Sequence, residues 1–156
     1  MIEFDIPGRR YYRLEHLALD LNGTLTFDGK IIPGTAERLG KLQSVINIMI
    51  VTADTYGKAN ELGKNLGIPV HKLEPGNEAV QKSDFVRNLG SDKVVSIGNG
   101  ANDSLMLKES ALGICVLGTE GTSAGALSNS DLVAQDISIA LDLLINPKRL
   151  IATLRE

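Results

Sequence analysis

The sequence predicts an α/β fold in which a parallel β-sheet lies between two layers of helices. Short β-branched apolar runs alternate with helical segments along most of the chain, a pattern typical of parallel sheets covered on both faces. The 156 residues suit one domain with a core of its own. We expect that single domain to span residues 1–156, with an N-terminal hairpin over about 1–14, a core over about 15–145 and a helical tail over about 146–156.

The strands are predicted from apolar runs and turn residues. Residues 2–6 and 10–14 alternate between apolar and polar around the turn dipeptide Pro7-Gly8, which predicts a β-hairpin. Apolar runs then predict the strands of the sheet. These strands are expected at 16–21, 46–51, 68–71, 93–97, 113–117 and 131–134.

Helices are expected between these strands. Pro33-Gly34-Thr35 is a plausible helix start, and Gly67 and Gly90 are plausible helix ends. Asn146-Pro147 should interrupt the helical pattern before a last short helix. The other helices are expected at 56–66, 76–89, 101–109 and 137–145.

Charge, hydropathy and cysteine count argue against several classes of protein. A net charge of −3 gives no electrostatic footprint for nucleic acid or an anionic membrane. The longest apolar stretch, residues 45–51, is too short to span a bilayer. The first residues lack the basic and apolar regions of a signal peptide, and the single cysteine, Cys115, cannot form an internal disulfide. We therefore expect a cytoplasmic protein that binds neither nucleic acid nor membrane.

Three of the expected strands end in polar segments. Residues 20–24, 52–54 and 98–103 are rich in Asp, Asn, Thr and Gly, the residue types that hold a metal ion and a phosphate. Ligands of open parallel sheets bind outside the carboxyl ends of the strands. The chemistry is therefore expected where these three segments meet.

The first of these segments carries a recognisable motif. Asp20-Leu21-Asn22-Gly23-Thr24-Leu25-Thr26 resembles D-x-x-G-T-[LV], the first motif of the haloacid dehalogenase (HAD) superfamily, and is closest to the D-K-T-G-T-L-T of P-type ATPases. The resemblance implies that Asp20 is a nucleophile that forms an aspartyl-phosphate. By itself, the segment could equally be an Asn-Gly turn after a strand.

The second and third motifs are weaker. Val51-Thr52-Ala53-Asp54 is similar to the T-G-D segment of P-type ATPases, which implies that the Thr52 hydroxyl binds a phosphoryl oxygen; a helix N-terminus is the alternative. The segment from Lys82 to Val86 is similar to K-x-x-x-V of the same proteins. Lys82 would then balance the charge of the nucleophile and the phosphoryl group, although a lone lysine is usually a surface residue.

The fourth motif is the most specific. Residues 98–107, Gly-Asn-Gly-Ala-Asn-Asp-Ser-Leu-Met-Leu, resemble the G-D-G-x-N-D signature shared by P-type ATPases and HAD phosphatases. The resemblance implies a Mg²⁺ cofactor, a hard cation that takes oxygen ligands. Its implied metal ligands are Asp20, Asn99, Asp103 and the backbone carbonyl of Asn22. The resemblance also assigns phosphate or cofactor binding to Gly23, Thr24, Ala53, Gly100 and Asn102.

Two substitutions depart from the family pattern. Most HAD phosphatases carry a general-acid Asp where this chain has Asn22, and an amide cannot carry the proton. Asn99 replaces the first Asp of the metal motif, so the site has one negative charge fewer. Both changes point to slow hydrolysis or to none.

The chain is too short for the insertions of many relatives. Only 31 residues lie between Asp20 and Thr52, and 29 between Thr52 and Lys82, which leaves no room for a nucleotide-binding or cap domain. The resemblance therefore implies a capless, Rossmann-like HAD fold, similar to the stand-alone soluble P-type-ATPase-like proteins of prokaryotes. Capless members tend to form oligomers or to act on large substrates, so the resemblance leaves both a homo-oligomer and a large substrate open.

Three functions follow from this resemblance. The first is a slow Mg²⁺-dependent phosphohydrolase that uses Asp20, Asn22, Thr52 and Lys82 on a small phosphorylated metabolite. The second is a catalytically weakened domain that binds phosphate, a metabolite or a regulatory partner protein. The third is a phospho-acceptor whose aspartyl-phosphate persists. Residues 118–124 are either a simple connection or a loop that binds substrate.

Overall fold

A six-stranded parallel sheet forms the centre of the protein in a computed structural model that describes residues 1–54 and 56–156. The strand order is β10-β9-β8-β3-β6-β7, and every neighbouring pair is parallel. The strands are β3 (His16–Leu19), β6 (Asn47–Thr52), β7 (Val70–Lys72), β8 (Val94–Gly98), β9 (Leu112–Val116) and β10 (Leu132–Ala134). The predicted parallel sheet is confirmed.

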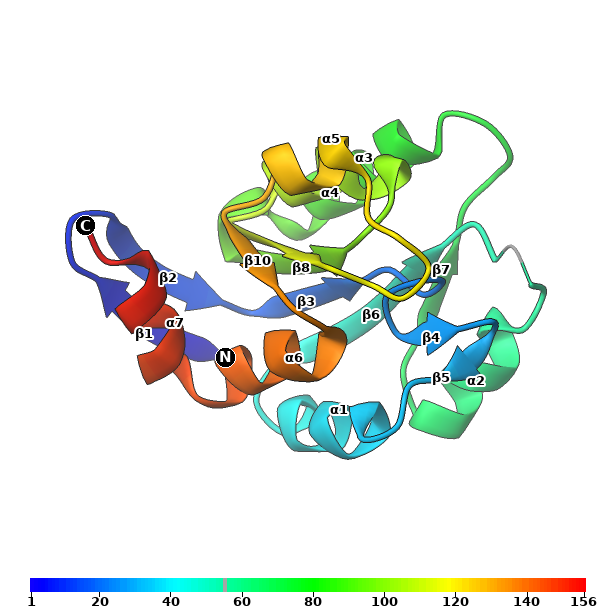
Figure 1. Cartoon of the computed structure of the whole chain (residues 1–156), viewed down its shortest axis with the longest axis horizontal. Helices are drawn as coiled ribbons and strands as arrows, with labels where there is room; N and C mark the ends of the chain where they lie inside the picture. Colours follow the sequence, from blue (N-terminus) through cyan, green and yellow to red (C-terminus); the bar gives the residue numbers. More distant parts are fainter. Residues whose placement is uncertain (55) are drawn as a thin grey trace.

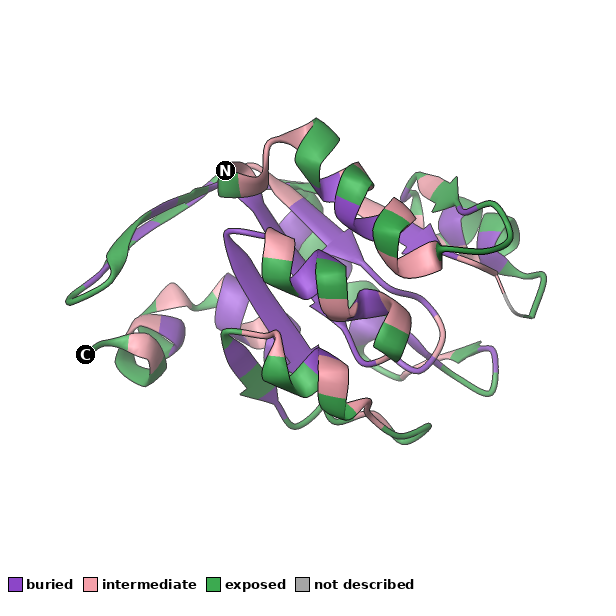
Figure 2. Cartoon of the chain, turned by 90° about the horizontal axis from the view of Figure 1, so that it is seen from above, coloured by how far each residue is buried: buried purple, intermediate pink, exposed green. Residues whose placement is uncertain are grey.

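Helices cover both faces of this sheet (Figure 1). One face carries α3 (Glu78–Leu89), α4 (Ser104–Glu109) and α5 (Ala124–Ser128), and the other carries α1 (Thr35–Gln43), α2 (Ala59–Leu66) and α6 (Ile137–Ile145). Every residue of β8 and β9 is buried, as expected for strands covered on both sides. Figure 2 shows the buried strands between helices whose outer faces are exposed. The three-layer arrangement is therefore as predicted.

The N-terminal hairpin is also confirmed. Strands β1 (Ile2–Ile6) and β2 (Arg10–Leu14) pair antiparallel, and the side of β1 that carries Ile2, Phe4 and Ile6 is buried. Helix α7 (Pro147–Leu154) packs on β1, and the Glu156 N–H donates to the Pro7 carbonyl at 3.2 Å. The hairpin and α7 lie at the opposite end of the molecule from the short strands β4 and β5 (Figure 1).

Some features differ from the sequence prediction. Strands β4 (Thr26–Phe27) and β5 (Lys30–Ile31) form a second small hairpin, which is not among the predicted elements. Helix α5 was not predicted either. Helix α2 begins at Ala59 and β7 at Val70, two or three residues later than expected, and α3 begins at Glu78. Two short 3₁₀ helices, Ser91–Lys93 and Ala101–Asp103, flank β8.

Local chemistry explains where several helices begin and end. Gly67 closes α2 in the left-handed region, with φ of 66°, a common helix end. The Asp136 side chain accepts the Ile139 N–H at the start of α6, which is ordinary N-capping. Arg38 of α1 pairs with Asp142 of α6 through two contacts of 2.9 and 3.1 Å. This bidentate pair ties together two helices on one face of the sheet.

Among the residues that the structure describes, no helix is both long and apolar enough to span a membrane.

Candidate active site

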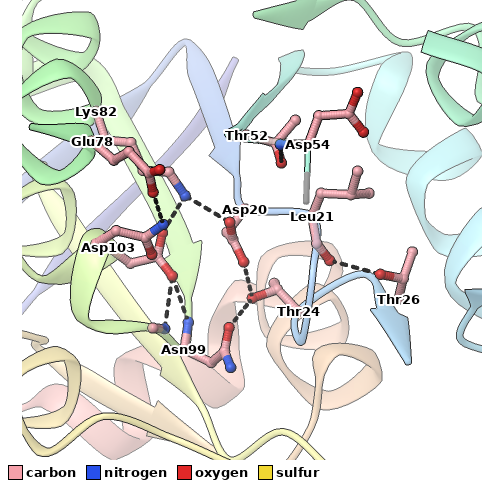
Figure 3. Close-up of polar contacts among 12 residues, drawn as sticks. Asp20, Leu21, Thr24, Thr26, Thr52, Asp54, Glu78, Lys82, Asn99 and Asp103 are labelled. Carbon is pink, nitrogen blue, oxygen red and sulfur yellow. Dashed lines mark hydrogen bonds and ion pairs between the residues drawn. The ribbon is translucent and has the colours of Figure 1, made fainter. Parts of the chain in front are cut away.

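Three of the four predicted motif segments meet at the carboxyl ends of the central strands. Strand β3 lies between β6 and β8; Asp20 follows β3, Thr52 ends β6 and Asn99 follows β8. Their side chains gather at one place (Figure 3), and all three residues are buried. The sequence rule that placed the chemistry at these strand ends therefore leads to one compact polar cluster.

Lys82 enters this cluster from α3. It is fully buried, and its Nζ lies 2.6 Å from Asp20 Oδ1 and 2.6 Å from Asp103 Oδ1. Figure 3 shows the ammonium group between the two carboxylates. A buried lysine is stable only when paired with opposite charge, and here two carboxylates provide it. The lysine suggested by the third motif is therefore no surface residue.

Asp103 is fixed by the loop that precedes it. Its Oδ2 accepts the backbone N–H groups of Asn99 and Gly100, at 3.0 and 2.8 Å. A side chain at Gly98 would collide with this carboxylate, because a Cβ there would lie 2.5 Å from Asp103 Cγ. The first glycine of the fourth motif thus leaves the space that Asp103 fills.

Thr24 joins the first motif to the fourth. Its Oγ1 lies 3.0 Å from Asp20 Oδ2 and 3.0 Å from Asn99 Oδ1, and the Asn99 amide nitrogen donates to the Gly121 carbonyl at 2.8 Å. Gly23 packs against the same amide: a Cβ there would lie 2.6 Å from Asn99 Nδ2, and its φ is +78°. Glycine is the residue that adopts this conformation without strain.

The Thr52 hydroxyl accepts a hydrogen bond from the turn that follows β6. The backbone N–H of Asp54 donates to Thr52 Oγ1 at 2.9 Å, so the hydroxyl is an acceptor there and keeps its proton to donate elsewhere. Asp54 accepts the Ala59 N–H at 2.9 Å and pairs with Lys72 at 3.2 Å. Although burial opposes them, these contacts hold the pKa of Asp54 below its ordinary value. Asp54 therefore stabilises the turn and the start of α2.

The remaining predicted residues have different surroundings. Asn22 is half-buried, and among the described residues its side chain has no hydrogen bond. Ala53 and Gly100 are half-buried beside Thr52 and Asn99. The side chain of Asn102 donates to Glu78 Oε2 at 2.9 Å, and its predicted binding role stays a prediction.

Glu78 and Gly121 are the site residues that sequence reasoning missed. Glu78 lies one turn before Lys82 on α3, so the two residues share a helix face. Its bond to Asn102 ties the helix that carries Lys82 to the loop that carries Asp103. The spacing of four residues between Glu78 and Lys82 was the available signal. The Gly121 contact uses a backbone carbonyl, which no motif records.

The carboxylate–lysine cluster is electrostatically strained. Burial, reinforced by the neighbouring Asp103, raises the pKa of Asp20 to about 6 against the opposing effects of Lys82 and Thr24. Burial lowers the pKa of Lys82, but Asp20 and Asp103 together raise it above its ordinary value. Strongly perturbed groups that share a polar cluster at strand ends are typical of functional sites.

The same residues have the donor chemistry of a Mg²⁺ site. Asp20, Asn99 and Asp103 all offer oxygen, the atom that this cation prefers. Asp20 Oδ2 and Asn99 Oδ1 both face the single proton of the Thr24 hydroxyl, so one of them is always left without that donor. The described residues contain no group of three or more His, Cys, Asp or Glu that could hold a metal; of the three predicted ligands, Asn99 is an amide. The residues fit a Mg²⁺ site that carries less negative charge than a site with the family's full set of aspartates.

No family model matches the chain, but known proteins resemble it. It is 45% identical over 91 residues to the uncharacterized protein MJ0073 of Methanocaldococcus jannaschii, covering 56% of this chain and 98% of that protein. It is 31% identical over 129 residues to the copper-transporting ATPase HMA5 of Oryza sativa, covering 78% of this chain and 12% of the ATPase. The chain thus spans about an eighth of the pump.

Solved structures resemble the fold over nearly the whole chain. One is the 3-deoxy-D-manno-octulosonate 8-phosphate phosphatase of Moraxella catarrhalis with magnesium, phosphate and KDO, with a TM-score of 0.68, 21% identity and coverage of 91% of this chain and 94% of that one. Another is the cobalt-bound Haemophilus influenzae enzyme, with a TM-score of 0.72, 12% identity and coverage of 92% and 94%.

These likenesses define the fold: it is that of HAD-superfamily phosphatases, and the four motifs resemble those of the same superfamily. The fold has no cap domain between β3 and α1, since the described segment there holds only the β4–β5 hairpin. By sequence, the chain belongs to the same family as MJ0073 of Methanocaldococcus jannaschii.

Proposed function

We propose that this protein is a slow Mg²⁺-dependent phosphohydrolase that transfers the phosphoryl group of a small phosphate monoester to Asp20 and then to water. The observation that carries the proposal is Lys82, fully buried and 2.6 Å from the carboxylates of both Asp20 and Asp103. Removing so many charges from water is costly. Buried charges that lower stability and gather where strand ends meet are typical of an active site.

The residues support a two-step reaction. In the first step a carboxylate oxygen of Asp20 bonds to phosphorus, the ester P–O bond breaks, and the leaving oxygen takes the electron pair. In the second step the oxygen of water bonds to the same phosphorus, the bond to Asp20 breaks with its electron pair returning to the carboxylate, the water proton passes to bulk solvent, and inorganic phosphate leaves. Lys82 neutralises Asp20 and the transferred group, and Thr52 donates its free hydroxyl proton to a phosphoryl oxygen.

Mg²⁺ supplies positive charge to the phosphoryl oxygens when it is bound. Asp20, Asn99 and Asp103 would hold it, together with the backbone carbonyl of Asn22. Since Asn99 is neutral, we expect weaker metal binding than in relatives with Asp at this position.

Asn22 makes the reaction slow for ordinary esters. It lies at the position of the general acid, yet its amide cannot protonate a leaving group, and general acid–base catalysis contributes about 10²–10⁴-fold. Esters whose leaving group departs without a proton should therefore be the best substrates. Small phosphorylated metabolites with acidic leaving groups, such as acyl or enol phosphates, fit this requirement.

Hydrolysis of p-nitrophenyl phosphate, with and without Mg²⁺, tests the proposal. Its phenolate leaves without needing a proton, so the lack of an acid at Asn22 matters least. We expect metal-dependent turnover that disappears in Asp20→Asn. The control variant Asp92→Asn, which changes an exposed aspartate, should retain it. Absence of turnover at high Mg²⁺ from folded protein would contradict a hydrolase.

A second candidate function is the binding of phosphate or a phosphorylated metabolite without turnover. The observation that favours it is the pair of amides. Asn22 cannot act as a general acid, and the Asn99 amide nitrogen donates to the Gly121 carbonyl. Calorimetry with Mg²⁺ and inorganic phosphate separates the two functions. Phosphate binding without Mg²⁺ binding supports this candidate, and Mg²⁺ binding that strengthens phosphate binding favours the hydrolase.

A further inference from the structure

A cleft of about 740 Å³ lies beside the candidate active site. Three segments line it: the stretch from Gly23 to Pro33, which includes the β4–β5 hairpin, residues 116–119 at the end of β9, and residues 135–138 at the start of α6. Its volume is in the range of sites for small organic molecules, about 300–1,000 Å³. Neither Asp20 nor Asp103 lines the cleft, so it is a neighbour of the phosphoryl site and not the phosphoryl site itself.

The walls of the cleft are mostly apolar. Phe27 of the hairpin and Leu117 after β9 are each 46% exposed, although both are large apolar side chains. Ile31, Ile32 and Ile137 add further apolar surface. Exposed apolar side chains gathered around one hollow mark a binding site more often than isolated ones do.

The cleft shares a wall with the catalytic loop. Gly23 and Thr24 line it, and the Thr24 hydroxyl lies 3.0 Å from the carboxylate of Asp20. Gly118, also in the wall, packs so closely on the Gly23 carbonyl that a Cβ there would lie 2.4 Å from the oxygen. A molecule in the cleft therefore contacts the loop that holds the nucleophile.

Charge in the cleft restricts what can bind. Its lining carries the carboxylates Asp28 and Asp136 and one cation, Lys30. A third carboxylate, Glu120, accepts the Asp28 N–H at 2.7 Å and links the hairpin tip to the loop after β9. This excess of negative charge disfavours a second phosphate or carboxylate on the ligand.

We propose that this cleft binds the organic part of the substrate, and that the substrate is a phosphate monoester with one apolar group of aryl size. The inference rests on the proposed phosphohydrolase function and names its substrate class. The phosphoryl group faces Asp20, and the apolar group passes Gly23 and Thr24 into the cleft. Nucleoside polyphosphates and sugar bisphosphates are excluded by the acidic walls.

Three substrates test the proposal: 2-naphthyl phosphate, phenyl phosphate and acetyl phosphate. The first two have leaving groups of similar acidity and differ mainly in apolar surface. We expect kcat/KM for 2-naphthyl phosphate to exceed that for phenyl phosphate roughly tenfold, since burying even two added carbon atoms changes affinity by about that factor. The difference should lie mainly in KM.

Leu117→Ala should reduce the ratio of naphthyl to acetyl phosphate kcat/KM roughly three- to tenfold. Leu127→Ala is the matched control, because Leu127 is 45% exposed on α5 and does not line the cleft. Calorimetry with 2-naphthylphosphonate provides a readout without turnover, and Leu117→Ala should weaken this binding while Leu127→Ala does not.

The outcomes distinguish a failure of the cleft proposal from a failure of the proposed phosphohydrolase function. Turnover of all three substrates with equal kcat/KM for phenyl and naphthyl phosphate overturns the cleft proposal and leaves the phosphohydrolase intact. Equal effects of Leu117→Ala and Leu127→Ala on naphthylphosphonate binding also overturn it. Absence of turnover with every ester overturns the proposed function, and the substrate class with it.

Discussion

Replacing Lys82 with methionine removes the one positive charge that the described side chains place inside the carboxylate cluster. Methionine has a similar length and fills the same buried space without charge. The change leaves the carboxylates of Asp20 and Asp103 facing each other without the ammonium that contacts both. The folded state should become less stable, because buried charges are then uncompensated.

The distances in the cluster set the size of this loss of stability. Each carboxylate oxygen lies 2.6 Å from Lys82 Nζ, so the two oxygens are at most about 5 Å apart. Two unit charges at that separation repel by about 3 kcal/mol at an effective dielectric constant near 20. Removal of one partner of a buried ion pair costs about 3–5 kcal/mol. A loss of that size lowers the melting temperature of a domain of this length by roughly 6–20 °C.

Thermal unfolding at pH 7 in the presence of EDTA measures the effect. The matched control is Lys108→Met, because Lys108 is exposed on α4, and it should change stability little. Added Mg²⁺ should recover part of the loss in Lys82→Met, since the cation restores positive charge near the carboxylates. A loss below about 1 kcal/mol, or equal losses in both variants, would refute this electrostatic reasoning.

Three other variants test separate parts of the site. Asn22→Asp should raise turnover of alkyl phosphates by about 10²–10⁴-fold and that of p-nitrophenyl phosphate far less; equal kcat changes for both would contradict the role given to Asn22. Glu78→Ala should cost about 1 kcal/mol of stability and lower kcat, whereas Glu78→Gln, which keeps an acceptor for Asn102, should retain most of both in unfolding and kinetic assays. Asp54→Asn should cost about 1 kcal/mol at pH 7, measured by urea unfolding. The pKa of Asp54 is lowered in the folded state, so its stabilisation is present above the unfolded pKa of about 3.9 and is lost as the pH falls through the folded pKa. The difference from wild type should therefore shrink as the pH falls through the folded pKa; a difference that stays constant with pH would count against an ionic role.

The sheet and the position of the site could be predicted because they depend on simple patterns. Apolar runs marked the strands, and the polar segments after them marked the strand ends that meet in space. The spatial neighbours of Asp20 followed from that rule together with the family motifs. Lys82 is different, since no local pattern separates a buried lysine on a helix from an exposed one. Its position came from the resemblance alone.

The features that were missed depend on tertiary contacts. Strands β4 and β5 have two residues each, too short to show an alternating pattern. Helix α2 starts late because the side chain of Asp54, in a left-handed conformation with φ of 56°, accepts the Ala59 N–H and sets the start of the helix there. Glu78 was overlooked because its partner, Asn102, is distant in the sequence. The apolar cleft combines three separate segments, and only the fold brings them together.

The central claim, that Asp20 is the nucleophile, is tested most directly by acid quenching during turnover of acetyl phosphate, followed by peptide mass mapping. Without an acid–base group at Asn22, the second step should be slow, so phosphoryl-enzyme should accumulate. We predict one added phosphoryl group on the peptide that contains Asp20, and none in Asp20→Asn. Turnover with no phosphoryl group on that peptide, or turnover that persists in Asp20→Asn, would contradict the account.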